Sequence, residues 1–267
     1  MDRPVTGYPY LDEAAGTVIA MAHRGGALHP ELRGLENTLH AFEHAVALGY
    51  RYLETDVHAT SDGHLVAFHD EVLDRVTDRA GPLASTQAAE VALARIGGEH
   101  AVPGMADLLE AFPDCQFNID LKSPAAVRPL AALLDRAGAH DRVLVGSFSL
   151  SSLRQFRALT GGRVATSAAP AEAAAFLTLP VPRLARLVTR GRVAALQVPV
   201  RRGRLRIVDA GLVRRAHAAG AHVHVWTVDE PAEMDRLVAL GVDGLITDRT
   251  DLLKDVLVRR GLWEDAA

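Results

Sequence analysis

Short runs rich in β-branched and aromatic residues alternate along this chain with amphipathic stretches rich in alanine and leucine. This alternation is typical of α/β proteins with a parallel sheet. The pattern predicts eight strands, at residues 18–22, 50–57, 116–122, 142–146, 163–167, 193–198, 221–227 and 244–247. Helices are expected near residues 37–48, 105–112, 125–137, 151–159, 171–179, 181–190, 209–219, 231–240 and 250–260. With 267 residues, the chain fits one (β/α)₈ TIM barrel, whose usual size is about 250 residues, and we expect a single catalytic domain over residues 1–267.

A hairpin is predicted directly after the second strand. Asp62 and Gly63 lie between two strand-like runs and form a strong two-residue turn signal, so residues 65–68 belong to the hairpin rather than the barrel. This register would place Asp56 directly opposite His69, with Cβ atoms about 5 Å apart. Residues from about 70 to 104 do not follow the alternation, and we expect them to form an insertion over the mouth of the barrel.

Two carboxylates share one face of the second strand. Glu54 and Asp56 are two residues apart, so both side chains project from the same side. A hard divalent cation such as Mg²⁺ or Ca²⁺ would relieve their repulsion, because these ions prefer oxygen ligands. The alternative is a solvated strand face, and the pattern alone leaves both interpretations open.

Other polar residues lie where predicted strands end, and active sites of such barrels lie at the carboxyl ends of the strands. Asp120 and Lys122 have a simple alternative as an exposed ion pair, and Trp226 is equally well read as a core aromatic. Asp248 is expected to cap the last helix. The residues that would converge at the mouth are His23, Arg24, Glu54, Asp56, Asp120, Lys122 and Trp226.

Charge and cysteine content limit the function. The net charge is −4 and the pI is about 6.3, so no broad basic surface favours nucleic acid or an anionic membrane. The run from Arg201 to Arg206 is expected to be a solvated loop, with contact to anionic headgroups as the alternative. Cys115 is the only cysteine, which excludes an intramolecular disulfide. The start of the chain shows no leader pattern and no stable membrane span, so a cytoplasmic location is expected.

Most of the twelve histidines are expected to have no catalytic or metal-binding role, because a lone histidine is usually a surface residue or a hydrogen-bonded core residue. His58 and His64 flank the predicted turn, and both are expected to be solvated. The other histidines interpreted as ordinary surface or core residues are His29, His44, His100, His140 and His217.

Several motifs occur in the order found in the glycerophosphodiester phosphodiesterase family, which this chain resembles over nearly its whole length. The specific matches are His23-Arg24-Gly25, Glu36-Asn37-Thr38, Glu54-Thr55-Asp56, His69-Asp70 and the stretch from Leu73 to Thr77. Weaker matches are Asn118 to Lys122, Val225 to Val228 and Gly241 to Asp248.

The resemblance implies roles for individual residues. It implies that His23 and His69 are the catalytic pair, that Arg24 and Lys122 contact the phosphate, and that Glu36 lies in the pocket. It also implies that one divalent cation is bound by the residues matching the family's acidic ligands, Glu54, Asp56 and Asp120. The third ligand is usually Glu in the family, and Asp120 is about one methylene shorter. The loop from Ala27 to Leu35 is longer than is usual there.

The implied reaction is metal-dependent hydrolysis of glycerophosphodiesters to glycerol 3-phosphate and an alcohol. One histidine would deprotonate the nucleophile, either water or the glycerol 2-hydroxyl, and the other would protonate the leaving oxygen. Two alternatives remain open at this point: a lysophospholipase D that acts on lysophospholipids, and a non-catalytic phosphate-binding barrel. The alcohol group and the oligomeric state are not indicated.

Overall fold

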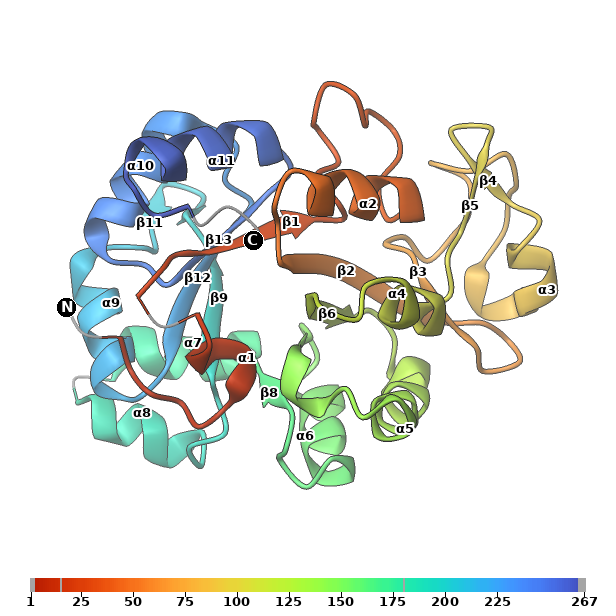
Figure 1. Ribbon diagram of the computed structural model, residues 1–267. Helices are drawn as coiled ribbons and strands as arrows, with labels where there is room; N and C mark the ends of the chain where they lie inside the picture. Colours follow the sequence, from red (N-terminus) through yellow and green to blue (C-terminus); the bar gives the residue numbers. More distant parts are fainter. Residues whose placement is uncertain (1–2, 15, 180, 264–267) are drawn as a thin grey trace.

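Eight parallel strands form a barrel in the computed structural model, which describes residues 3–14, 16–179 and 181–263 (Figure 1). In spatial order the strands run β8-β7-β6-β2-β1-β13-β12-β9. A parallel bridge between Ser167 and Ala195 joins the two ends of this order, so the barrel closes between β8 and β9. The expected fold is confirmed, and each barrel strand lies within two residues of its predicted position: β1 (Ile19–His23), β2 (Tyr52–Ala59), β6 (Gln116–Leu121), β7 (Val143–Gly146), β8 (Ala165–Thr166), β9 (Ala195–Pro199), β12 (His222–Trp226) and β13 (Gly244–Thr247).

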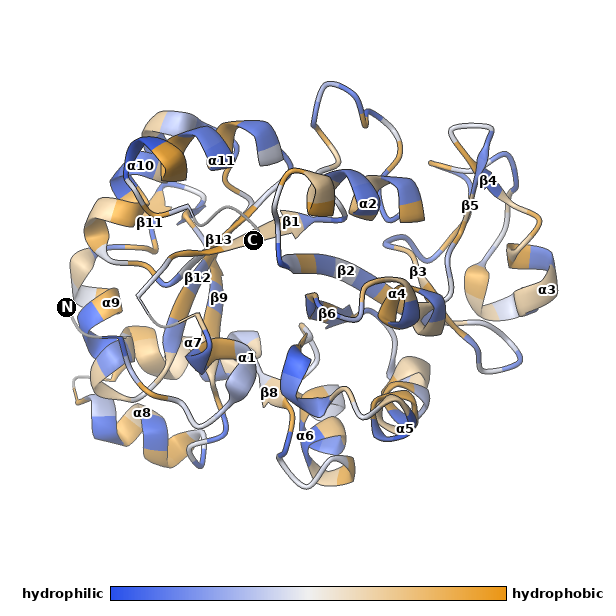
Figure 2. Cartoon of the chain, viewed as in Figure 1, coloured by the Kyte–Doolittle hydropathy of each residue, from blue (hydrophilic) through white to orange (hydrophobic). Residues whose placement is uncertain are grey.

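Helices surround the barrel, and their apolar faces pack on the outward side chains of the strands. Several begin at side-chain caps, as Thr38 does when its hydroxyl accepts a hydrogen bond from Ala41 N. In Figure 2 the helix α5 carries both blue and orange residues, as an amphipathic helix does. The helices lie at α2 (Leu39–Ala47), α4 (Met105–Ala111), α5 (Val127–Ala137), α6 (Leu150–Leu159), α7 (Pro170–Thr178), α8 (Pro182–Val188), α9 (Ala210–Ala218), α10 (Pro231–Leu240) and α11 (Thr250–Arg259).

One end of the barrel interior is filled by apolar side chains. The short helix α1 (Pro9–Asp12) inserts Tyr10 and Leu11 next to Ile19 and Met21 at the start of β1. The ring of Tyr10 also meets Tyr52 edge-on, with centroids 5.2 Å apart. Since this packing fills the amino ends of the strands, only the carboxyl ends are left to form a site.

Residues between β3 (Leu65–Ala67) and α4 form an insertion where the sequence predicts one, but it lies to one side of the barrel, beyond β3 and α4, and none of residues 70–104 lines the mouth cavity (Figure 1). It contains a short 3₁₀ turn, η1 (Leu83–Ser85), the helix α3 (Ala88–Val91) and the pair β4 (Arg95–Ile96) and β5 (His100–Ala101). The insertion has an apolar cluster of its own, separate from the barrel core, which includes Phe68, Leu73, Leu83, Val91 and Ile96.

The hairpin register differs from the prediction by one residue. The loop has three residues, 61–63, because Thr60 N donates to His64 O at 2.9 Å and Gly63 adopts a φ of +83°. The Thr60 hydroxyl stabilises this loop by donating to Asp62 at 2.6 Å and accepting from His64 N at 3.0 Å. Asp56 is therefore opposite Phe68, whose N–H it accepts at 3.0 Å, and the predicted pairing of Asp56 with His69 is wrong.

The expectation for His58 is also wrong. Its side chain is buried, and its Nε2 lies 3.1 Å from the backbone oxygen of His69. Burial lowers the pKa of His58, so the neutral imidazole donates this hydrogen bond. His64, by contrast, is exposed as expected. His58 thus supports the backbone that carries His69.

Among the described residues, no helix combines the length and the apolar character that a membrane crossing requires.

Candidate active site

A cavity of about 640 Å³ opens at the carboxyl ends of the barrel strands. Its polar wall comes from the ends of β1, β2 and β6 and from the chain that follows β3. Almost all of the predicted site residues line it: His23, Arg24, Glu54, Asp56, His69, Asp120, Lys122 and Trp226. Glu36 is the exception: it does not line the cavity, and it is connected to the lining residues through the guanidinium of Arg24, which donates to it at 3.1 Å, and through Arg75.

Lys122 joins two of the predicted metal ligands. Asp56 and Asp120 are direct neighbours in the parallel register of β2 and β6. The Lys122 Nζ lies 2.8 Å from an oxygen of each of them. Burial alone would raise the pKa of Asp56, but Lys122 and Arg24 outweigh it and hold the carboxyl below its usual range. Asp56 is therefore ionised and has two cationic partners.

Glu54, unlike Asp56, has a raised pKa and no lysine or arginine partner among the described residues. Its side chain is buried, and burial raises its pKa to about 7. One oxygen accepts a hydrogen bond from Arg24 N at 3.2 Å, and His23 Nε2 lies 3.7 Å away. No lysine or arginine side chain forms an ion pair with Glu54 within the described ranges. This carboxylate is the one whose charge the protein compensates least.

The donor set fits a hard divalent cation, because Glu54, Asp56 and Asp120 offer oxygen ligands on one wall and Glu54 lacks a full counter-charge. The three carboxylates are not gathered to within 4.8 Å of one another in the part of the chain that is described, and the ammonium of Lys122 joins Asp56 to Asp120 instead. The match to the family's cation chemistry thus lies in the type of ligand, three carboxylates on one wall, and not in their spacing.

His23 forms a partly buried pair with Asp248. The His23 Nδ1 lies 2.7 Å from Asp248 Oδ1, which directs Nε2 toward Glu54. Burial lowers the pKa of His23, but the Glu54 carboxylate and the hydrogen bond to Asp248 outweigh it and raise the pKa overall. Asp248 was expected to cap α11, and that prediction is wrong: its side chain binds His23 and the helix begins without a side-chain cap.

His69 forms a second pair, with Asp70, that is more open to solvent. The His69 Nδ1 lies 2.5 Å from Asp70 Oδ1. Arg75, from the insertion, binds Asp70 and also forms two hydrogen bonds to Glu36, at 2.7 and 2.8 Å. Arg75 holds the pKa of Asp70 at about 2. A chain of charges therefore connects His69 through Arg75 and Glu36 to Arg24.

The backbone that positions Arg24 is unusual. Arg24 and Asn37 both have positive φ, of 50° and 57°, and Asn37 N donates to Arg24 O at 2.9 Å. Gly25 has a φ of +86°, and a Cβ there would lie 2.6 Å from Ala41 Cβ, so only glycine fits. Asn37 in turn donates to Asp56 at 3.2 Å. Strained backbone at a charged cluster is typical of a functional site.

The second wall of the cavity is largely apolar and comes from the later strands and from α7. Phe148 and Trp226 meet edge-on with centroids 6.0 Å apart, so Trp226 is a pocket residue rather than a core aromatic. The Arg201 to Arg206 run forms an exposed hairpin of β10 (Arg201–Arg202) and β11 (Leu205–Arg206), and Arg202 reaches the rim. The apolar lining includes Phe148, Ala173, Ala174, Leu177, Val198, Ile207 and Trp226.

Four residues whose side chains bind those of predicted site residues were not themselves predicted as site residues. Asn37, Asp70 and Arg75 all lie within the matched motifs, which was the available signal. Asp248 also lies in a weaker match, but its position before a helix favoured a capping role.

An eight-stranded parallel barrel with acidic, basic and imidazole groups at its mouth suits an enzyme that acts on phosphate esters. Residues 23–252 match the model of the glycerophosphoryl diester phosphodiesterase family. The chain belongs to this family, and its activity is that of a glycerophosphodiester phosphodiesterase. Enzymes of the family typically use a divalent cation.

Individual relatives agree over nearly the whole chain. A probable glycerophosphodiester phosphodiesterase of Mycobacterium tuberculosis is 42% identical over 253 residues, covering 94% of this chain and 95% of its own length. A human lysophospholipase D is 27% identical, covering 89% of this chain and 85% of its own. The fold matches the structure of an Oleispira antarctica phosphodiesterase in complex with the product sn-glycerol-3-phosphate, with a TM-score of 0.75, 23% identity, and coverage of 91% of this chain and 97% of that one.

Proposed function

We propose that the cavity hydrolyses small glycerophosphodiesters, with one divalent cation, Mg²⁺ or Ca²⁺, held by Glu54, Asp56 and Asp120. The observation that carries this proposal is the buried Glu54, which is left without a lysine or arginine partner in the described structure. When bound, the cation supplies positive charge that stabilises the phosphoryl oxygens. Arg24 and Lys122 add fixed positive charge at the same wall.

We assign the general acid to His23 and the general base to His69. An acid must hold a proton near neutral pH, and the Asp248 carboxylate, which is not one of the proposed cation ligands, favours the protonated form of His23 through its bond to Nδ1 at 2.7 Å. His23 therefore donates a proton from Nε2 to the leaving oxygen, while His69 accepts one from the attacking hydroxyl of water or of glycerol. Asp248 and Asp70 bind the Nδ1 atoms and hold each ring in one orientation.

Removal of metal tests the core of this proposal. A chelator should abolish turnover of glycerophosphocholine, and Mg²⁺ or Ca²⁺ should restore it in the wild type. Glu54→Gln should lose both the activity and its metal-dependent recovery without unfolding. Turnover that survives complete chelation would contradict the proposed cation site.

A second substrate class, lysophospholipids, is favoured by the apolar wall. Phe148, Leu177 and Ile207 offer no partner to a phosphate or an alcohol hydroxyl, whereas an acyl chain would bury its surface against them. A product assay on glycerophosphocholine beside lysophosphatidylcholine compares the two classes directly.

The apolar wall can be changed without touching the polar one. Ala174 lines the cavity, whereas Ala171 is an exposed residue of the same helix α7. Ala174→Trp should lower turnover of lysophosphatidylcholine and spare glycerophosphocholine, while Ala171→Trp should change neither. Equal loss on both substrates would argue against an acyl-binding role for this wall.

A further inference from the structure

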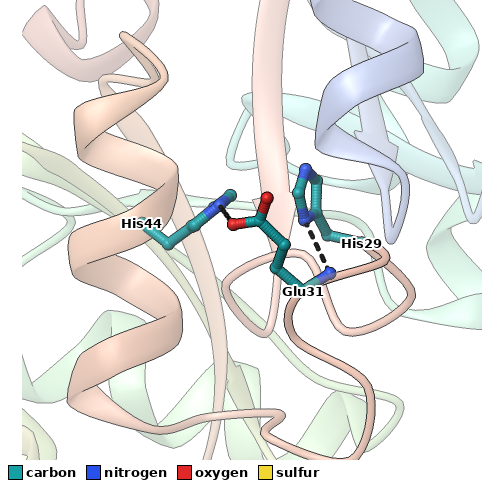
Figure 3. Close-up of side chains that lie close together, drawn as sticks. All are labelled: His29, Glu31 and His44. Carbon is teal, nitrogen blue, oxygen red and sulfur yellow. Dashed lines mark hydrogen bonds and ion pairs between the residues drawn. The ribbon is translucent and has the colours of Figure 1, made fainter.

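Three side chains that do not line the cavity converge elsewhere on the molecule. His29 and Glu31 lie in the loop at residues 24–38, between β1 and α2, and His44 lies on α2 (Figure 3). Each of the three offers one ligand atom, and these atoms all lie within 4.8 Å of one another. Within residues 3–14, 16–179 and 181–263, no other set of three histidine, cysteine or acidic side chains is gathered this closely.

The spacing of the group is that of ligands around one metal ion. Ligands bound at about 2.0–2.1 Å to a tetrahedral zinc ion are separated by about 3.3 Å. The His44 Nε2 lies 3.3 Å from Glu31 Oε2, which equals this separation. A charge-assisted hydrogen bond is usually shorter, at about 2.7–2.9 Å. The ring of His29 completes the group, with its centroid 4.3 Å from that of His44.

The surroundings leave the group accessible and the ligands oriented. Glu31 is exposed, so an ion can enter and water can complete its coordination. The ring of His29 is buried and oriented by a hydrogen bond that its Nδ1 accepts from Glu31 N at 3.2 Å. The His44 Nδ1 is also buried, and no described residue pairs with it.

An ion at this position would join the loop to the helix that follows it. The loop has no regular secondary structure of its own and is held by turns such as His29 N to Gly26 O at 2.9 Å and Leu32 N to His29 O at 2.9 Å. Long loops of this kind are commonly functional. The same loop carries Arg24 and Glu36 at its two ends.

We propose that His29, Glu31 and His44 form a second metal site, which binds a divalent transition metal of the zinc class. Two imidazole nitrogens and one carboxylate suit zinc, nickel or copper better than Mg²⁺ or Ca²⁺, which prefer oxygen. The site therefore differs in chemistry from the all-carboxylate wall of the cavity, and it does not depend on the activity proposed above.

Zinc titration in excess Mg²⁺ tests this site. The wild-type chain is first stripped with a chelator, then titrated with Zn²⁺ against a chromophoric competitor while Mg²⁺ saturates the carboxylate wall. We expect one bound equivalent of Zn²⁺, and we expect Glu54→Gln to retain it. Glu31→Gln and His44→Gln should each weaken the affinity at least about 10-fold. Because Glu31 is exposed, Glu31→Gln is expected to fold even if a histidine variant does not.

A thermal melt gives an independent readout. Saturating Zn²⁺ should raise the melting temperature of the wild type, because an ion that binds only the native state stabilises it. Glu31→Gln should lose this increment, and His64→Gln, which replaces an exposed histidine outside the group, should keep it. Absence of a Zn²⁺ equivalent in the wild type, or unchanged affinity in Glu31→Gln and His44→Gln, would overturn the proposal.

Discussion

The two histidine–aspartate pairs at the cavity contain the same kind of hydrogen bond but differ in their surroundings. Both histidines use Nδ1 to bind an aspartate, so both can direct Nε2 toward substrate. The side chain of His23 is 17% exposed, and its partner Asp248 forms no ion pair with an arginine among the described residues. The side chain of His69 is twice as open, at 34%, and its partner Asp70 is also bound by Arg75.

This difference supports the proposed division of roles, in which His23 is the general acid and His69 the general base. In the metal-free protein Glu54, and after it Asp248, raise the pKa of His23, and no arginine shares the Asp248 carboxylate among the described residues. The charge of Asp70 is divided between His69 and a guanidinium. An acid and a base at neighbouring positions need environments that differ in this way.

The largest expected difference between the two histidines is in how their variants respond to the leaving group of the substrate. An alkoxide needs a proton from the enzyme, whereas a nitrophenolate is already a weak base. His23→Ala should therefore reduce turnover of glycerophosphocholine by about 10²–10⁴-fold and turnover of a nitrophenyl phosphodiester much less. His69→Ala should reduce both by a similar factor. Steady-state kinetics with both substrates gives the two ratios.

The opposite pattern would exchange the two roles. If His69→Ala, rather than His23→Ala, spares the nitrophenyl ester, then His69 is the acid. If both variants keep wild-type turnover of the natural diester, neither histidine carries protons in this reaction.

The partner aspartates should differ by a smaller factor. Asp248→Asn removes the charge that supports His23, and we expect a loss of kcat on the order of 10–100-fold. Asp70→Asn should cost less, because Arg75 and Glu36 still order the segment around His69. Near-wild-type KM values would show that the loss is in proton transfer. An equal loss of kcat in both variants would remove the distinction between the pairs.

The pH dependence of kcat/KM gives a second test of the different roles of the two pairs. If His23 is the acid, activity falls at high pH as His23 loses its proton. Asp248→Asn removes a contribution that raises the pKa of His23, so the alkaline limb of kcat/KM should move to lower pH. Asp70→Asn should leave that limb in place. An unmoved alkaline limb in Asp248→Asn would count against His23 as the acid.

The smallest effect concerns the stability of the metal-free protein. The pKa of Glu54 is about 7 in the fold and 4.5 ordinarily, so the native state binds more protons between these values and loses stability as the pH rises through them. At pH 8 in a chelator, Glu54→Gln should raise the free energy of unfolding by on the order of 1–3 kcal/mol. A thermal melt would record this as a gain of several degrees.

A variant at Glu36, which binds Arg24 and Arg75, serves as the control of opposite sign. Burial raises the pKa of Glu36, but its bonds with Arg75 and Arg24 outweigh it and lower the pKa overall. Glu36→Gln should therefore destabilise the protein at pH 8. At pH 5, where Glu54 is mostly protonated, most of the gain in Glu54→Gln should vanish. A Glu54→Gln protein that melts no higher than the wild type at pH 8 would show that this carboxylate is already compensated.

The barrel was predictable because its signal is local and repeated. Each strand is a short apolar run and each helix an amphipathic one, so both kinds of element could be located from neighbouring residues. The hairpin was less determined, because Asp62 and Gly63 suit a loop of two or of three residues. The side chain of Thr60, which hydrogen-bonds on both sides of the loop, selects three.

The residues of the site were predictable from the sequence, but the side chains that hydrogen-bond to them were less so. The resemblance placed His23, Glu54 and Lys122 at one mouth, where the structure also has them. The partner of His23 is 225 residues away in sequence, so a local interpretation of Asp248 as a helix cap was natural. Likewise, the bond between Arg75 and Glu36 joins the insertion to the first loop across 39 residues.

The separate apolar cluster of the insertion affects how the protein unfolds locally. A segment with its own small apolar cluster can unfold while the barrel stays folded, at a lower free-energy cost than global unfolding. When it does, Arg75 leaves Glu36 and Asp70, and the chain that carries His69 loses its neighbours. The fraction of enzyme competent for catalysis would then be set by a local equilibrium. Amide hydrogen exchange would show it as faster exchange at residues 70–104 than in the barrel strands.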